Sequence, residues 1–360
     1  MESFRIDESG YTGHDLLNQD QRFQGATAIA ISNEDAARLI REHFPALRAP
    51  ELKYRSLARR PAYHPRIISL QRDLLNEYKC VTYICDKRYL LMLMFLDDAV
   101  EPFYYKRGID FYENGQNYEM ASVLFHAGPA LLGEDALDAL LVAFQCAVKE
   151  KTPEALAKLI SSARRTKWCE LPEILGPLAQ YAAPECLRAI AMPVANTDAA
   201  LVVLQSLISR MEVMADGPYR IEHDQSKNLL TYHELLQRFI DHKEKIEFRQ
   251  TEITSLRFPL KLTEVTQVDS RTSPAVQLAD VTIGAAIEAT NKIAGLRSGG
   301  LEPEALMSLY REDQIIHLLP SIDFEEQRRF RQGTQAGELI DYFGRNFRGS
   351  YLGKGRVRAR

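Results

Sequence analysis

Two neighbouring carboxylates close a strand-like stretch near the start of the chain. The stretch is FRIDESG, residues 4–10, and it places Asp7 and Glu8 just before a Ser-Gly turn. Asp and Glu are poor strand residues, and adjacent like charges repel each other. A bound metal ion would offset that repulsion, because Mg²⁺ prefers carboxylate oxygens as ligands. The pair indicates a metal site, provided that other parts of the chain supply further acids.

Two further acids stand out late in the chain. Asp224 ends the stretch YRIEHD, whose alternation of apolar and polar residues is typical of a strand. Asp280 lies in a helix that we expect to begin after Ser273, since Ser followed by Pro favours a cap and a first helical turn. Gln277, Asp280 and Gly284 share one face of that helix, at spacings of three and four, and Gly284 would let the helix approach the sheet closely. An acid on such an Ala-rich helix is hard to place unless it faces a polar site.

Composition restricts the class of protein. The 360 residues are 46% hydrophobic and 26% charged and carry a net charge of −4, values that are ordinary for a soluble globular protein. Any nucleic-acid binding must therefore come from local patches. The five cysteines show no paired CxxC spacing, which argues against a zinc site or a disulfide framework.

Membrane association is not expected. The longest apolar run, YLLMLMFL at 89–96, is too short to span a bilayer and is typical of a buried helix. The charged start of the chain is unlike a signal peptide. We expect a cytoplasmic protein with no membrane partner, and its oligomeric state stays open.

Strand-like stretches fall into two blocks. The expected strands cover residues 3–8, 25–32, 79–85, 219–224 and 261–270. The expected helices include one that Asn33 caps, one over 67–78, one over 229–246 and the one after Ser273. Residues 89–215 read as helical throughout, interrupted by prolines. Each strand block alone is too small for a core, so we predict one mixed α/β sheet formed by both blocks.

Four short motifs resemble a known family. They are FRIDESG, the ELK of residues 51–53, the EHDQSKN of residues 222–228 and the SPAVQLAD of residues 273–280. In this order they resemble the ribonuclease H-like nucleases, and more closely the bacterial and phage family called domain of unknown function 3800, which is assigned to that fold. The match covers the strand blocks and skips the helical middle.

The resemblance implies an organisation as well as a fold. The expected division is a ribonuclease H-like core at residues 1–88 and 216–300, a helical insertion at 89–215, C-terminal helices at 301–344 and a basic tail at 345–360. The insertion has no counterpart in the motifs.

The resemblance also implies a metal-dependent nuclease centre. In that fold one Asp lies on the central first strand, a second acid ends a neighbouring strand and a third comes from a late helix, which places Asp7, Asp224 and Asp280 in these roles. Glu51 matches the extra acid that some of these enzymes contribute. Two Mg²⁺ or Mn²⁺ ions about 4 Å apart can activate a water and stabilise the leaving oxygen of a phosphodiester.

Several polar residues would support such a centre. Lys53 would bind a phosphate or stabilise developing charge. Lys227 and Asn228, just after Asp224, would contact the substrate backbone. Candidate accessory residues are Glu8, Ser9, His14 and Gln277.

Other functions remain open at this point. The chain could be a catalytically inactive ribonuclease H-like module that binds nucleic acid or regulates a partner. An ATPase of the actin-like relatives is disfavoured, because no GxxxxGK[ST] loop is present. The resemblance further implies a role in phage defence or in a mobile element.

Each assignment also has a purely structural interpretation. Glu51 and Lys53 could be a surface pair, and Asp224 could start an ordinary turn. His223 should point to the sheet face opposite Asp224 and pack there. The tail contains six basic residues and no acid from Arg345 onward, and is typical either of a nucleic-acid arm or of a disordered end. Basic spots at ARRP (58–61) and SARRTK (162–167) are typical of solvated surface.

Overall fold

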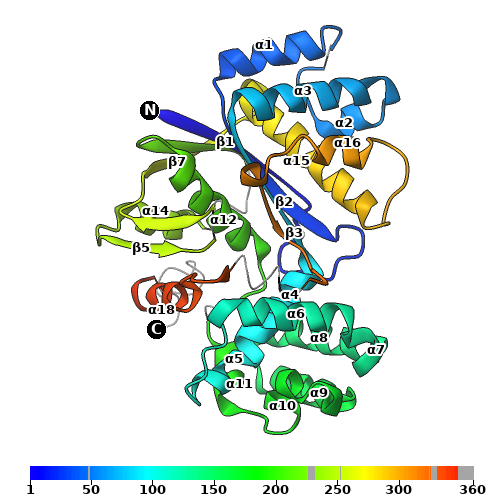
Figure 1. The fold of residues 1–360 in the computed structure, drawn as a ribbon, viewed down its shortest axis with the longest axis vertical. Helices are drawn as coiled ribbons and strands as arrows, with labels where there is room; N and C mark the ends of the chain where they lie inside the picture. Colours follow the sequence, from blue (N-terminus) through cyan, green and yellow to red (C-terminus); the bar gives the residue numbers. More distant parts are fainter. Residues whose placement is uncertain are drawn as a thin grey trace, which may run out of the picture.

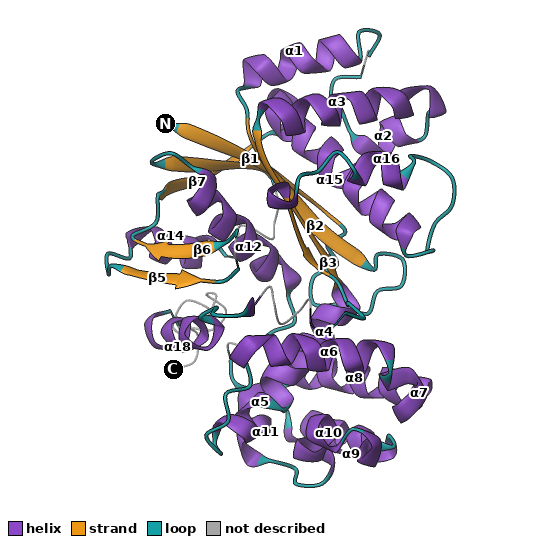
Figure 2. Ribbon diagram, viewed as in Figure 1, coloured by secondary structure: helices purple, strands orange, loops and turns teal. Residues whose placement is uncertain are grey.

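A mixed six-stranded sheet forms the centre of the molecule (Figures 1 and 2). The structure is a computed structural model, and it describes residues 1–47, 49–193, 195–225, 232–251, 253–323, 325 and 331–347. The strand order is β7-β4-β1-β2-β3-β8. The strands are β1 (Glu2–Ser9), β2 (Phe23–Ala30), β3 (Lys79–Asp86), β4 (Tyr219–Asp224), β7 (Leu262–Val268) and β8 (Ile315–Leu318).

Both sequence blocks contribute to this one sheet, as predicted. The first block forms an antiparallel meander in which β2 pairs with β1 and β3. The second block then adds β4 parallel to β1, and β7 parallel to β4. The chain is therefore an α/β protein with β1 near the middle of a mixed sheet.

The residue pattern of β1 explains its central position. Phe4 and Ile6 are 0% and 2% exposed and pack on one face of the sheet. Arg5 points to the other face, where its guanidinium bonds the Glu222 carboxylate on β4 at 3.0 Å. Gly10 then turns the chain with φ +82°, and a Cβ there would lie 2.0 Å from the Phe23 carbonyl oxygen. The turn after the acidic pair thus requires glycine.

Helices cover the two faces of the sheet as separate layers. One face carries α1 (Asn33–His43), α2 (Tyr54–Ala58), α3 (His64–Glu77), α15 (Pro274–Ile293) and α16 (Pro303–Met307), which share one core cluster. The long α15 packs along β1 and β2. The other face is covered by α12 (Ala199–Met214), which packs on β2 and β3. Figure 1 shows the first layer in the upper right part of the view.

Residues 87–191 form a helical body below the sheet in Figure 1. Its helices are α4 (Lys87–Ala99), α5 (Glu101–Tyr105), α6 (Gln116–His126), α7 (Gly128–Leu132), α8 (Glu134–Glu150), α9 (Pro153–Arg165), α10 (Pro172–Ala179) and α11 (Pro184–Ala191). Its core is continuous with the sheet face that holds Phe4 and Ile6. The helical content of the predicted insertion is confirmed, whereas its division from the core at 89 and 215 stays a prediction. The helix α12 lies within that range, yet it packs on the sheet.

Several elements differ from the sequence expectation. The cap of α1 is Ser32, whose hydroxyl accepts from the Asp35 amide at 3.0 Å, while the Asn33 side chain accepts from the Ala275 amide at the start of α15. The predicted C-terminal helical part contains a strand, β8, which pairs in parallel with β3. Short apolar stretches such as IIHL do not distinguish strand from helix until a neighbouring edge is known.

The sequence did not predict a small hairpin or the bounds of the last helix. The hairpin consists of β5 (Ile246–Arg249) and β6 (Ser255–Phe258), and α14 (His233–Asp241) precedes it. The helix α18 (Ala336–Asn346) packs on this region through rings such as Phe239, Phe258 and Tyr342. Described residues of the predicted basic tail end at Phe347, so the rest of the tail lies outside the described part.

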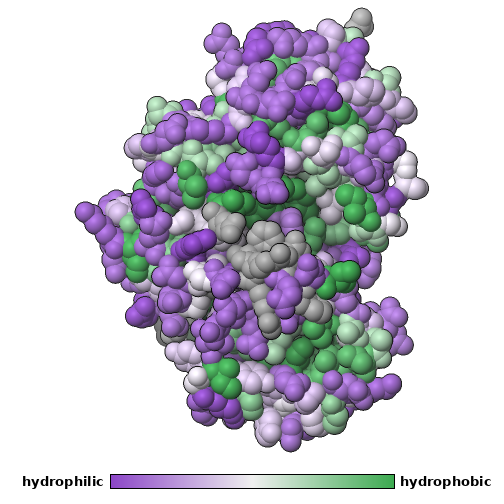
Figure 3. Space-filling view, viewed as in Figure 1, coloured by the Kyte–Doolittle hydropathy of each residue, from purple (hydrophilic) through white to green (hydrophobic). Residues whose placement is uncertain are grey.

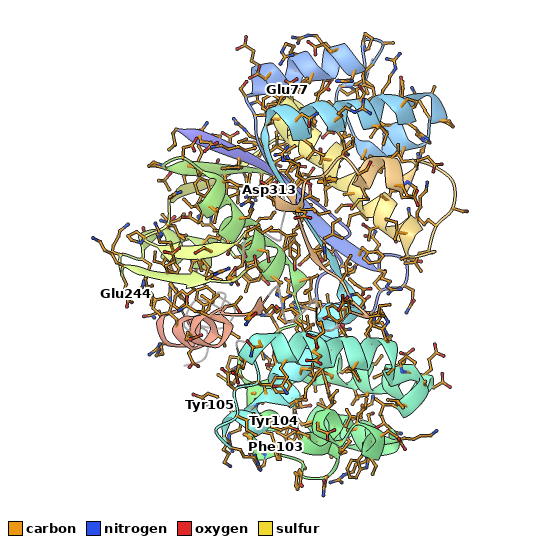
Figure 4. All side chains as sticks on the ribbon, viewed as in Figure 1. Glu77, Phe103, Tyr104, Tyr105, Glu244 and Asp313 are labelled. Carbon is orange, nitrogen blue, oxygen red and sulfur yellow. The ribbon has the colours of Figure 1, made fainter. Side chains whose placement is uncertain are left out.

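Two side-chain features are visible in Figure 4. Asp313, in the centre of the view, accepts a hydrogen bond from Arg210 of α12 at 2.9 Å and so ties α12 to the segment before β8. Phe103, Tyr104 and Tyr105 lie on α5 at the left of the helical body. In the part of the chain that the structure describes, no helix combines the length and apolar character needed to cross a bilayer.

Candidate active site

The sheet places Asp7 beside Asp224. Strands β1 and β4 are parallel, and the last paired residues are Ile6 and His223. The next residue on each strand is an aspartate, and neighbouring strands lie about 4.8 Å apart. The two carboxylates, separated by more than two hundred positions in the sequence, therefore share one edge of the sheet.

Helix α15 supplies the third aspartate. It packs against β1, and Asp280 Oδ2 accepts a hydrogen bond from the Tyr54 amide at 2.6 Å. Burial, and then the charge of Asp280, raises the pKa of Asp7 to about 8, and Asp224 adds to this effect. Burial, with the charges of Glu51 and Asp224, also raises the pKa of Asp280. Neighbouring negative charges thus oppose the ionisation of Asp7 and of Asp280.

Residues 51–53 complete the cluster from the loop before α2. Lys53 Nζ lies 3.0 Å from Glu51 Oε1 and 3.8 Å from Asp224 Oδ2. Burial alone would lower the pKa of Lys53, but the bond to Glu51 and the charges of Asp280 and Asp7 outweigh it and raise that pKa. The surface pair proposed as a plain alternative does exist, but it lies inside the acidic cluster.

Main-chain amides hold one oxygen of each aspartate. Asp7 Oδ1 accepts from the Glu8 amide at 2.8 Å. Asp224 Oδ1 accepts from the Gln225 and Ser270 amides at 2.8 and 3.2 Å. Asp280 Oδ2 accepts from the Tyr54 amide. The second oxygen of each aspartate accepts no hydrogen bond from the described residues, so it remains as the oxygen that can bind a ligand.

A second layer of polar contacts joins the segments. Gln277 Oε1 accepts from the Leu52 amide at 2.8 Å, while its Nε2 donates to the Ser270 carbonyl at 2.7 Å. Ser270 Oγ donates to Glu51 Oε1 at 2.5 Å. Gln277 was predicted as an accessory residue on the Asp280 face, and its observed role is to link residues 51–53 to the loop after β7. Ser270 was not predicted from the sequence, because its only local signal was its position shortly after the end of a strand.

Gly284 makes a close approach, but to a different partner from the one expected. A Cβ at this position would lie 2.5 Å from the ring of Tyr54 on α2. The glycine thus lets α2 lie against α15, rather than letting α15 approach the sheet. The contact fixes the residue that follows Lys53 and donates to Asp280.

A pocket opens beside the carboxylates on the α12 side of the sheet. It is lined by Ile6, Asp7, Glu8, Ala26, His223 and Asp224 and by four residues of α12, Ala200, Val203, Leu204 and Leu207. His223 packs on the face opposite Asp224, as alternation predicted, and it is 4% exposed. Its Nδ1 lies 2.6 Å from the Asp224 carbonyl oxygen, and burial lowers its pKa.

The remaining predicted residues take different positions. Ser9 pairs with Gly25 as the last residue of β1. His14 is exposed, and its carbonyl accepts from Thr197 Oγ1 at 3.0 Å. No contact joins the His14 imidazole to the four acids within the described residues, so its predicted accessory role gains no support. Lys227 and Asn228 lie outside the described residues.

The donor chemistry fits a hard divalent cation. Asp7, Glu51, Asp224 and Asp280 offer only carboxylate oxygens, which suit Mg²⁺ and Mn²⁺ better than zinc. In the chain as far as it is described, however, no group of three or more His, Cys, Asp and Glu residues is placed so that it could already hold a metal ion. The acids instead surround the ammonium group of Lys53.

Comparison with known proteins adds no relative. No family model, no curated protein and no solved structure matches the chain.

Proposed function

We propose that the protein is a metal-dependent nuclease with a ribonuclease H-like core, which hydrolyses phosphodiester bonds of nucleic acid by a two-metal carboxylate mechanism. The fold assignment is supported by the placement of the acids. Asp7 lies on β1, the first strand and a central one, and Asp224 ends the neighbouring strand β4. Asp280 comes from the late helix α15, which packs on β1.

One observation carries the proposal. Four carboxylates from four separate segments converge at one edge of the sheet, with Lys53 as the cation among them, and the charges of their neighbours help to raise the pKa values of Asp7 and Asp280. Such a cluster destabilises the fold through repulsion between like charges. Such an arrangement is expected where a site has to bind positive charge. Carboxylates that lie in a pocket and have strongly shifted pKa values are typical of functional sites.

The roles of the residues follow from their contacts. Asp7, Asp224, Asp280 and Glu51 would hold Mg²⁺ or Mn²⁺, which supply Lewis-acid activation of water and of the phosphodiester when bound. Main-chain amides keep the aspartates oriented, so little reorganisation is needed. Lys53 would move from Glu51 toward the substrate phosphate as the cations neutralise the acids. Lys227 and Asn228 stay predicted substrate contacts.

A second function is favoured by the same lysine. Lys53 already offsets part of the negative charge through its bond to Glu51. A chain that kept the fold and lost turnover would need such an internal cation in place of a metal. The alternative is therefore an inactive module that binds nucleic acid or regulates a partner.

The test is a cleavage assay on single- and double-stranded DNA and on RNA, with Mg²⁺ or Mn²⁺ and with EDTA. The variants are Asp7→Asn, Asp224→Asn and Asp280→Asn. Asp216→Asn is the matched control, because Asp216 precedes the opposite end of β4 and pairs with Lys79 at the surface. We expect cation-dependent cleavage that is lost by at least about 100-fold in each site variant, since even residues outside the ligand shell cost about 10- to 100-fold.

Each result decides between the two functions. Cleavage that needs the cation and survives only in Asp216→Asn supports the nuclease. Tight binding without cleavage under every cation condition rejects the nuclease and supports the inactive module. Cleavage that persists unchanged in Asp7→Asn and Asp224→Asn would place the activity elsewhere and reject the site.

A further inference from the structure

A basic segment directly follows the acidic site. Residues 52–72 contain six Lys and Arg residues and no Asp or Glu. The segment forms α2, a short turn at Pro61–Tyr63 and the first half of α3. It includes the ARRP motif, which the sequence alone left as ordinary solvated surface.

Four arginines of this segment have no acidic partner. Arg55, Arg59, Arg60 and Arg66 are exposed, and none forms an ion pair with a described residue. Arg60 lies over the ring of Tyr63 at 5.6 Å, and Arg66 donates to the His43 carbonyl. We call these four residues the arginine surface.

Paired arginines elsewhere provide the contrast. On the neighbouring α1, Arg38 bonds Glu42 at 3.1 Å, and on β6, Arg257 bonds Glu247 at 2.6 Å. Arg107 in the helical body pairs with Glu185. Exposed arginines of this chain can therefore find carboxylates, whereas those of the arginine surface form no ion pair within the described part of the chain.

The arginine surface is rigidly joined to the acidic site. Helix α2 begins at Tyr54, the residue after Lys53, and its first amide donates to Asp280. The Tyr54 ring lies against Gly284 of α15, and His64 Nε2 donates to the Ala58 carbonyl at 2.8 Å, which ties the end of α2 to α3. Arg55 is thus two residues from Lys53, and Arg59 follows one helical turn later.

The acids nearest to this segment are already engaged. Glu51 is bonded by Lys53 and Ser270, and Asp280 by the Tyr54 amide. Glu288 of α15 interacts with the Tyr54 hydroxyl. Among the described residues none of these acids forms an ion pair with the four arginines, whose side chains are exposed. Figure 3 shows a hydrophilic surface over α1 and α3 in the upper part of the view.

We propose that the arginine surface binds the sugar-phosphate backbone of a nucleic acid whose reacting phosphate lies at Asp7 and Asp224. The proposal rests on the proposed function and names the surface that brings the substrate to that site. An anionic site repels a polyanion, so an adjacent cationic surface must supply the attraction. Guanidinium groups are suited to this because they bind phosphate through two parallel hydrogen bonds.

The test measures binding by the full chain in EDTA, so that cleavage cannot interfere. The probes are oligonucleotides of the same length as single- and double-stranded DNA and as RNA, at several salt concentrations between about 50 and 200 mM. The variants are the triple Arg55→Ala/Arg59→Ala/Arg60→Ala and the corresponding triple Lys substitution. The matched control removes three paired arginines, Arg38→Ala/Arg107→Ala/Arg257→Ala, with the same change in net charge.

We expect the slope of log K against log salt to fall by about 2 to 3 in the triple Ala variant, since each phosphate contact contributes about 0.7 to 0.9. The triple Lys variant should keep most of the slope. The control should stay within about 0.5 of the wild-type value. Circular dichroism and thermal melting confirm that each variant is folded.

The outcomes separate the two proposals. A triple Ala variant that is folded and keeps the wild-type slope overturns the arginine surface and leaves the nuclease untouched. A slope that depends on the arginines without any cleavage under Mg²⁺ or Mn²⁺ supports the arginine surface and rejects the nuclease. A chain that binds none of the probes in EDTA overturns the arginine surface, and the cleavage assay with Mg²⁺ or Mn²⁺ decides the nuclease separately.

Discussion

Two groups of acids within the described residues contain carboxylates with raised pKa values, and the groups differ in how they are assembled. The first is the candidate active site at the end of β1 and β4. The second lies at the junction of α4 and α5, where burial raises the pKa of Asp97 to about 8 and those of Asp98 and Glu101 to about 7. Burial is the largest cause in both groups.

The supporting contacts separate the two groups. The site acids come from four segments, and main-chain amides orient the aspartates. Asp97, Asp98 and Glu101 come from five successive residues, and Asp97 interacts with the side chains of Asn117 and Tyr112. Asp97 Oδ1 and Asn117 Oδ1 are buried and have no hydrogen-bond partner among the described residues. Burial without a cationic partner favours the neutral form of Asp97, so this group is consistent with a neutral structural element. A raised pKa alone therefore does not identify a site.

The largest expected difference concerns stabilisation by cations. Mn²⁺ at about 100 times its dissociation constant should stabilise the wild-type chain by about 2.7 kcal/mol over the EDTA form, because it binds the folded state only. The Asp7→Asn variant should lose this stabilisation, while Asp97→Asn should retain it. Differential scanning calorimetry with and without the cation measures both. Equal stabilisation of all three proteins would remove the distinction between the two groups.

A glycine substitution in each region gives the next largest effect. Gly284→Ala should destabilise the fold by about 1–3 kcal/mol and reduce cleavage, because the new Cβ displaces the Tyr54 ring and with it Lys53. Gly176→Ala in α10 is the control, since its Cβ would meet nothing nearer than 4.0 Å. It should be neutral or stabilising by up to about 1 kcal/mol. Urea denaturation reports stability, and a Gly284→Ala protein as active as wild type would show that the α2–α15 contact does not position the site.

Polar side chains of the two regions should respond differently to replacement. Gln277→Met leaves the Leu52 amide and the Ser270 carbonyl without their partner, at a cost of about 1–3 kcal/mol for a buried group. Asn117→Leu removes the single interaction with Asp97, while its Oδ1 has no partner among the described residues, so it should cost less than the loss of two buried hydrogen bonds. Chemical denaturation compares the two, and cleavage should fall only for Gln277→Met. A larger loss of stability in Asn117→Leu than in Gln277→Met would mean that Gln277 does not hold the site segments together.

The smallest effect is the pH dependence of stability. Asp97 has a folded-state pKa of about 8 against an ordinary value of 3.8, so the folded state binds its proton more tightly than the unfolded state. Its contribution is complete below about pH 4 and declines as pH rises toward about 8. Between pH 7 and 9 the wild type should lose about 2–4 °C in Tm more than Asp97→Asn, equivalent to about 1 kcal/mol. Identical pH profiles would show that Asp97 is charged in the folded protein.

The sequence was sufficient to predict the candidate acidic residues and most of the strands. Alternation of buried and polar residues placed β1, β4 and β7, and acids at strand ends identified Asp7 and Asp224. Local pattern failed where a distant partner decides the structure. The strand β8 exists because β3 offers a parallel edge, and Ser32 rather than Asn33 caps α1 because Asn33 is used by α15. The roles of Ser270 and Gln277 depend on contacts across more than two hundred positions and had no local signal.

The amino-acid sequence by itself determined the α/β class, the two strand blocks around a helical middle and the types of residue available for chemistry, because periodicity and residue type are local properties. Tertiary structure decided which of these residues meet. Only the parallel pairing of β1 with β4 and the packing of α15 and α2 place four acids and Lys53 together. The same packing leaves the arginine surface next in the chain without an ion pair to any described residue. Electrostatic interactions depend on distance in space, and distance in space is set by the fold rather than by position in the chain.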